Sequence, residues 1–219
     1  HFSEGSWGII RVLDEVVSDL QPLPNQATGK EGIPKALPVC PSDAPVKNFN
    51  VVAIDYPQMD FNPTVPEAIE VGVERKIEVK NPDAKSFVLE EDMTRVAGEQ
   101  PMPLTLRVNV GDCMKVKLTN KMKNSRASFA ALGLAFDPKD SHGMNLGKNP
   151  GDQTVAPGGS RSYTFYADPF NGEMQSIGWD FGNVAMNPRN GLFGGVIIGP
   201  KGSQYRDPKT GAGISLKNS

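Results

Sequence analysis

The sequence predicts an all-β protein folded as a Greek-key β-sandwich, and three observations support this prediction. Apolar and polar residues alternate on both sides of Gly111-Asp112, which indicates two short strands that each bury one face. The segment from Phe193 to Ile198 is apolar at successive positions, as is typical of a strand covered on both sides. The 19 Pro and 23 Gly residues place turns between short strands, which favours a sandwich over a helical fold.

A short motif near the start of the chain returns near its other end. Gly5-Ser-Trp-Gly8 is followed by the apolar residues Ile9, Ile10 and Val12, and Gly191-Leu-Phe-Gly194 is followed by Val196, Ile197 and Ile198. The two motifs lie 186 residues apart, from 5 to 191, which is about one domain and a linker. We therefore expect residues 1–20 to be the C-terminal strand of a preceding domain. The chain would then be a piece of a longer protein or a processed product.

The remaining chain divides into a linker, one domain and a tail. Residues 21–46 are rich in proline, which lacks the backbone N–H that a sheet needs, so they are expected to run extended as a linker. Residues 47–210 are expected to form the sandwich domain, which begins with an alternating strand from Phe49 to Tyr56. Residues 211–219 are expected to be a tail.

Within this domain, two stretches are expected to be loops and a third to contain a strand. Residues 80–103 are polar, with an acidic run at Glu90-Glu91-Asp92, and are interpreted as a loop. The stretch from Asn171 to Asn190 is likewise interpreted as a loop. In the segment SRSYTFY, Tyr163 and Phe165 are expected to point to one side of a strand.

Composition excludes two classes of partner. The 23 Lys and Arg residues are balanced by 25 Asp and Glu residues, so no basic stripe for nucleic acid is expected. No apolar run approaches the roughly 18 residues that cross a bilayer, so no membrane span is expected. The two cysteines, Cys40 and Cys113, are either bridged or free, and the sequence leaves both possibilities open.

Four segments in order carry a resemblance to a known family: VNVGDCMKVKLTN, GLAFDPKDSHGMNLG, TVAPGGSRSYTFYADP and GLFGGVIIGPKGS. They resemble the cupredoxin domains of large multicopper oxidases, especially multidomain bacterial metal (manganese-type) oxidases and ceruloplasmin-like proteins. The resemblance implies a cupredoxin-type sandwich, copper in the complete protein and an extracytoplasmic (periplasmic or secreted) location. It implies one-electron oxidation of a metal ion or a phenol coupled to O2 reduction. The implied partners are the remaining cupredoxin domains, in the same or another chain.

The ligand inventory limits what this chain contributes to such an enzyme. A blue copper site needs two His and one Cys thiolate, and the family's three-copper cluster adds four His-x-His pairs, but this chain has only His1 and His142. Where the resemblance implies His-x-His-Gly, the sequence has Ala130-Ala131-Leu132-Gly133. Where it implies Tyr-His-Ser-His, the sequence has roughly Phe181-Gly182-Asn183-Val184. Residues 47–210 are therefore expected to hold no copper, and the chain no catalytic or cofactor-binding residue of its own.

His1 is the one candidate metal ligand. In copper-bearing relatives the run His-x-x-x-Gly-Met supplies a histidine and the axial methionine, and this sequence reads His1-Phe-Ser-Glu-Gly5-Ser6. By this resemblance His1 is a candidate type-1 copper ligand, with Ser6 in place of the axial Met. Its cysteine partner would lie upstream. The other reading is a terminal histidine without a metal role.

His142 lies in an acidic loop and has a less specific signal. We expect an exposed loop histidine, with a hard-cation site that uses Asp137, Asp140 and Asp152 as the alternative.

Three functions stay open from the sequence. The first is a mostly structural part of a multicopper oxidase, and the second is a non-catalytic β-sandwich module for assembly or binding. The third is a copper enzyme that binds its metal through the His1 amine and side chain together with His142.

Overall fold

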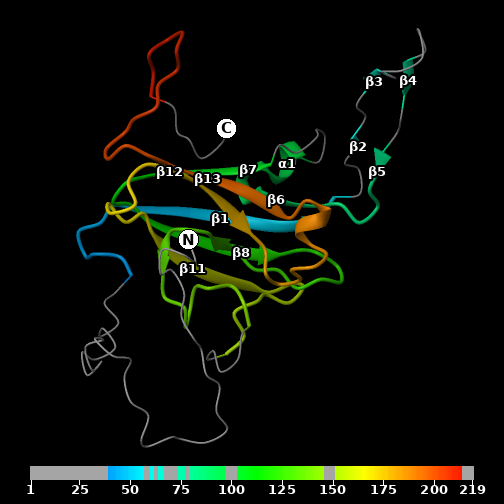
Figure 1. The fold of residues 1–219 in the computed structure, drawn as a ribbon, viewed down its shortest axis with the longest axis horizontal. Coiled ribbons are helices and arrows are strands. Elements are labelled where there is room, and N and C mark those ends of the chain that lie inside the picture. Colours follow the sequence, from blue (N-terminus) through cyan, green and yellow to red (C-terminus); the bar gives the residue numbers. More distant parts are fainter. Residues whose placement is uncertain are drawn as a thin grey trace, which may run out of the picture. The chain divides into compact units, whose positions relative to one another are not determined.

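Two β-sheets pack face to face in the computed structural model of this chain (Figure 1). The structure describes residues 39–56, 60–61, 64–66, 74–76, 79–96, 103–145 and 151–213, with the backbone alone for 60–61, 64–66, 74–76, 79–80 and 95–96. The predicted strand for residues 1–20 and most of the predicted linker lie outside the described residues.

The first sheet contains five strands. In spatial order they are β10 (Ala135–Phe136), β11 (Ser160–Tyr166), β8 (Cys113–Asn120), β1 (Val46–Asp55) and β6 (Lys85–Leu89). Strands β1 and β8 run parallel, from the pair Val46 and Cys113 to the pair Ala53 and Asn120, and the other pairs are antiparallel. This sheet is therefore mixed.

The second sheet contains four strands. They are β7 (Leu104–Asn109), β13 (Phe193–Gly199), β12 (Met174–Trp179) and β9 (Ala130–Ala131), with β7 and β13 parallel. Strands β7 and β8 are consecutive in sequence but belong to different sheets, so the turn between them carries the chain across the sandwich. Gly111 occupies this turn with φ 89°, a value that residues with a side chain rarely adopt.

The remaining elements are short. Two small ladders occupy the insertion between β1 and β6, formed by β2 (Asp60–Phe61) with β5 (Val79–Lys80) and by β3 (Thr64–Pro66) with β4 (Glu74–Lys76). The helical elements are η2 (Glu90–Asp92), α1 (Met93–Val96) and η3 (Pro188–Asn190). In the part of the chain that is described, no helix has the length and apolar character that a membrane crossing requires.

The core lies between the two sheets and follows the predicted alternation. Its fully buried side chains include Leu106, Met114, Val116, Leu118, Tyr163 and Phe165. Phe129 makes edge-to-face contacts with Phe87 and Phe165, at centroid separations of 5.5 and 6.1 Å. Each such side chain contributes about 1.5–3 kcal/mol through burial. The predicted fold class, an all-β Greek-key β-sandwich, is confirmed.

Two predicted loops are wrong because each contains a strand. The polar stretch 80–103 contains β6, whose Phe87 is fully buried and whose register with β1 pairs Phe87 with Ala53. The stretch 171–190 contains β12, whose inward positions include Ser176 and Gly178 instead of large apolar residues. A Cβ at Gly178 would lie 2.9 Å from the Phe129 ring, so packing requires glycine where alternation predicts an apolar residue.

The prediction that β13 is covered on both sides is also wrong for the described residues. Its inner face is buried at Val196 and Ile198, but the Phe193 side chain on the outer face is 41% exposed.

Candidate functional site

The two stretches where the resemblance places copper ligands adjoin each other. Ala130 pairs with Trp179 and Ala131 with Gly178, so β9 lies beside β12 and the 181–184 stretch follows directly after it. Ala130 and Ala131 are buried, and Leu132 is exposed. None of these side chains carries an imidazole or a thiolate, so the site does not fit copper.

A buried polar network connects these two stretches instead. The Asp180 carboxyl group is fully buried, and its Oδ1 accepts a hydrogen bond from the Ser128 backbone N–H at 2.6 Å. Its Oδ2 accepts from the Asn183 N–H at 3.1 Å and from Asn187 Nδ2 at 2.9 Å. The Ser128 Oγ in turn accepts the Phe181 N–H at 2.8 Å. These bonds join the segment before β9 to the segment after β12.

Asn187 adds further bonds between the same two segments. Its Nδ2 also donates to the Arg126 carbonyl at 2.8 Å, and its Oδ1 accepts from the Ser125 hydroxyl at 2.7 Å. All polar atoms of this buried amide therefore have partners. Gly182 lies so close to the same segment that a Cβ there would be 2.6 Å from the Ala127 Cα. The two segments touch through backbone as well as through hydrogen bonds.

Electrostatics distinguish Asp180 from the other acidic groups of the domain. Burial raises the pKa of the Asp180 carboxyl, although its hydrogen bonds from Asn183, Ser128 and Asn187 act in the opposite direction. Burial also raises the pKa of the neighbouring Tyr163 phenol, which donates to the Gln153 carbonyl at 2.7 Å. Within the described part of the chain, no Lys or Arg forms an ion pair with Asp180.

His142 is half-buried and is stacked, which corrects the expectation of an exposed loop histidine. Its ring lies on the Phe136 ring, with centroids 5.4 Å apart and an interplanar angle of 10°, and Phe181 lies at 6.0 Å. Its backbone N–H donates to Gln153 Oε1 at 2.8 Å. The His142 ring therefore packs against aromatic side chains from two separate segments.

The three aspartates proposed for a hard cation have other partners, and Asp137 accepts a hydrogen bond from the Lys139 N–H. Asp152 accepts hydrogen bonds from Asn145 and Thr154 and pairs with Arg126, and these interactions lower its pKa to about 2. Asp140 pairs with Arg161 at 3.0 Å. Among the residues whose positions are described, no group of three or more His, Cys, Asp or Glu side chains could hold a metal.

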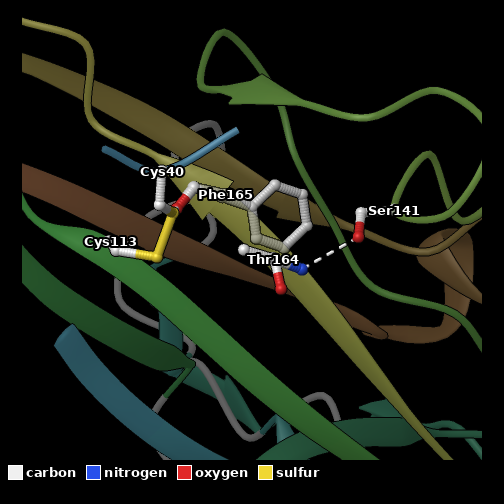
Figure 2. Close-up of a disulfide and its surroundings, with 5 residues drawn as sticks. All are labelled: Cys40, Cys113, Ser141, Thr164 and Phe165. Atoms are coloured by element: carbon white, nitrogen blue, oxygen red, sulfur yellow. Dashed lines mark hydrogen bonds between the residues drawn. A yellow bond between two sulfur atoms is a disulfide. The ribbon is translucent and has the colours of Figure 1, made fainter. Parts of the chain in front are cut away.

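The structure pairs Cys40 with Cys113, which decides the question that the sequence left open (Figure 2). The Cα atoms are 5.6 Å apart, within the usual range for a disulfide. The Cys40 sulfur lies 3.6 Å from the Phe165 carbonyl oxygen, and because a bridged sulfur carries no hydrogen this is a contact and not a hydrogen bond. The bridge ties the segment before β1 to the first residue of β8.

A cleft of about 450 Å³ lies beside this disulfide. Its apolar side includes Val39 and Val46, and its polar side includes Asp137, Ser141 and Lys115. The Ser141 hydroxyl at its edge accepts the Thr164 N–H at 2.9 Å, as Figure 2 shows.

His1, the candidate type-1 copper ligand, lies outside the described residues, so its role stays a prediction. The sequence did not single out Asp180, Ser128 and Asn187 as a group. Their one local signal is the Asp180-Phe-Gly-Asn183 turn, in which an aspartate accepts a backbone N–H three residues on. The longer bonds join residues 52 and 61 positions apart, which no local pattern reports.

No protein-family model matches this chain, and no curated protein matches it. Among solved structures, a laccase from Pediococcus acidilactici Pa5930 is 16% identical with a TM-score of 0.45, over 71% of this chain and 27% of the laccase. A multicopper oxidase is 24% identical with a TM-score of 0.45, over 74% of this chain and 45% of that one. The multicopper oxidase mgLAC is 18% identical with a TM-score of 0.47, over 72% and 40%. These three solved structures are a laccase and two multicopper oxidases, and the chain spans less than half of the length of each.

Proposed function

We propose that this chain is part of an extracytoplasmic multicopper oxidase, to which it contributes a copper-free β-sandwich domain. The observation that carries the proposal is the placement of the four segments that resemble the family. Although dispersed in sequence, they supply β8, β10, β11 and β13 of one sandwich. The four segments therefore belong to one domain and contribute strands to both of its sheets.

In the complete protein, copper would supply one-electron oxidation of a metal ion or a phenolic substrate, coupled to reduction of O2. The part contributed by residues 47–210 is structural, because Ala130, Ala131 and Leu132 stand where the family has ligands. His1 is the one residue of this chain that would reach a copper centre, as a type-1 ligand whose cysteine partner lies upstream. No catalytic residue is assigned within the chain.

The Cys40–Cys113 disulfide supports the extracytoplasmic location. Structural disulfides persist in the periplasm and outside the cell, whereas cytosolic reductants keep most thiols free. The buried position of Cys113, at the start of a core strand, marks this bridge as part of the fold.

The outer face of the second sheet supports the proposed partners, the remaining cupredoxin domains of the same or another chain. Leu132, Ile177 and Phe193 are 42%, 48% and 41% exposed on or beside β12 and β13. Leu132 and Ile177 are neighbours, since the Leu132 N–H donates to the Ile177 carbonyl at 3.1 Å. Exposed apolar faces of this kind mark contact surfaces. The same observation favours the second candidate function, a non-catalytic assembly module.

Copper analysis of the complete parent protein separates the two functions. The oxidase proposal expects at least about one copper per molecule, with oxidase activity, because a type-1 site holds one ion. Substitution His1→Ala in that protein is expected to remove the blue absorption of the type-1 site. Absence of copper together with absence of oxidase activity would leave the assembly module as the function.

A further inference from the structure

Asp180 is the one fully buried carboxyl group at the place where copper ligands are missing. A buried carboxylate is costly unless hydrogen bonds replace its hydration. Three donors supply them: the Ser128 N–H, the Asn183 N–H and the Asn187 amide, all at 3.1 Å or less. Burial of the Asp180 carboxyl group costs free energy, and hydrogen-bond donors to both of its oxygens offset this cost.

The donors come from two segments far apart in the sequence. Ser128 precedes β9 and Asn187 lies in the loop between β12 and β13, and Asp180 lies at the end of β12. Asn187 also donates to the Arg126 carbonyl and accepts from the Ser125 hydroxyl, so further hydrogen bonds join the same pair of segments. In a copper-bearing domain of the family the metal would join these two segments through its ligands. Here a carboxyl group makes the connection.

We propose that Asp180 takes the place of the metal. Its hydrogen bonds, instead of metal–ligand bonds, hold the 125–131 and 180–187 segments together. This inference rests on the proposed copper-free character of the domain. Its consequence is a sandwich whose loops are closed before any copper is loaded into the complete protein. The domain then serves as a rigid support that does not depend on the metal supply.

A carboxyl group suits this position, and an amide of the same shape does not. Both oxygens of Asp180 face N–H groups, with Ser128 at Oδ1 and Asn183 and Asn187 at Oδ2. An asparagine would turn one of these acceptors into an NH2 donor. A buried donor would then face another donor, and at least one N–H would lose its partner.

The test is hydrogen exchange and thermal unfolding of the full 219-residue chain with Asp180→Asn. We expect the Ser128 and Asn183 amides to exchange about tenfold faster or more than in the wild type, because a buried hydrogen bond to a charged group is lost. We expect the unfolding temperature to fall by about 4–10 °C. The matched control is Asp168→Asn, since Asp168 accepts one N–H, from Phe170, within its own loop. This control is expected to leave the Ser128 and Asn183 amides unchanged.

Asn187→Ala keeps the proposal testable if Asp180→Asn does not fold. It removes one donor to Asp180 and the bond to the Arg126 carbonyl, so faster exchange at Ser128 and Asn183 is again expected. Wild-type exchange at both amides in the folded variants would overturn the proposal.

A copper titration reports separately on the proposed function. Added Cu²⁺ is expected to leave the unfolding temperature of the His1→Ala chain unchanged, because no ligand set remains in the described domain. A copper-dependent rise in the His1→Ala chain would contradict the copper-free domain and its replaced metal. The exchange data on Asp180→Asn would still show whether the carboxyl group holds the two segments together.

Discussion

At the scale of single residues, two aspartates show how position sets the behaviour of one side chain. Asp152 is half-exposed and surrounded by Asn145, Thr154 and Arg126, and its pKa falls to about 2. Asp180 is fully buried, and burial raises its pKa despite its hydrogen bonds. A lowered pKa adds stability above the ordinary value near 3.8, and a raised pKa adds stability below that value. The two groups therefore give opposite pH dependences.

Asp152→Asn tests the first of these dependences. The wild type has stability from the ionised Asp152 that is present at pH 7 and lost as pH falls from the ordinary pKa near 3.8 toward 2. Because the Asp152 side chain is half-exposed, solvent screening limits the loss to about 0.5–1 kcal/mol at pH 7. Urea unfolding at pH 7 and at pH 2 checks this. An equal difference between wild type and variant at both pH values would contradict it.

At the scale of elements, what surrounds a strand decides whether its pattern can be recognised. Strand β8 alternates strictly because Met114, Val116 and Leu118 all face the core. Strand β12 does not alternate, because its inner face packs Gly178 against the Phe129 ring. Close contacts between elements also restrict which residues can occupy a position. Two examples are the Cys40–Cys113 disulfide and the approach of Gly182 to Ala127.

Gly182→Ala tests the close approach of the two segments around Asp180. The added Cβ would lie 2.6 Å from the Ala127 Cα, which is backbone and cannot rotate away. We expect the free energy of unfolding to fall by about 1–3 kcal/mol, as in other overpacked positions. Chemical denaturation measures this change. Gly151→Ala is a useful comparison, because open space surrounds Gly151, whose φ of 73° leaves only a backbone penalty.

Removal of the disulfide tests the attachment of the segment before β1. Cys40 and Cys113 are 73 residues apart, so their bond restricts a long loop of the unfolded chain. The double variant Cys40→Ser, Cys113→Ser is expected to lose about 3–4 kcal/mol of unfolding free energy. Guanidinium unfolding with and without a reductant checks this. A reductant should destabilise the wild type by a similar amount and leave the double variant unaffected.

At the scale of the whole molecule, the sandwich has one face that its own described residues do not cover. Ile177 and Phe193 lie on the outer side of the second sheet, with Gly195 beside Ile177 in the register. An exposed apolar area of this kind is typical of a contact surface. We expect this face to contact a neighbouring domain in the proposed oxidase, and to promote self-association of the isolated chain.

Ile177→Asp tests this face. The side chain is 48% exposed, so the substitution is expected to change the free energy of unfolding by no more than about 1 kcal/mol. Self-association of the chain at high concentration is expected to decrease, as measured by sedimentation velocity. The matched control is Gln175→Asp, which adds the same charge on the same strand and removes no apolar side chain. Equal sedimentation of both variants would argue against the apolar face as the contact.

The alternating strands and the missing copper ligands could both be predicted from the sequence. Alternation reports burial directly, because successive side chains of a strand point to opposite faces, and Leu106, Leu118 and Tyr163 are fully buried as expected. The ligand count requires no coordinates, since Ala and Leu have no donor atoms in any fold. Strands β6 and β12 were missed because their patterns depend on neighbours in the sheet.

The sequence by itself predicted a β-sandwich with too few histidines for the copper chemistry that the family resemblance implies. Only the tertiary structure decided which groups act together. The Cys40–Cys113 bond, the stacking of His142 on Phe136 and the donors around Asp180 depend on which strands become neighbours. Strand order is set by packing of the entire core, so contacts between residues 52 or 73 positions apart leave no local trace in the amino-acid pattern.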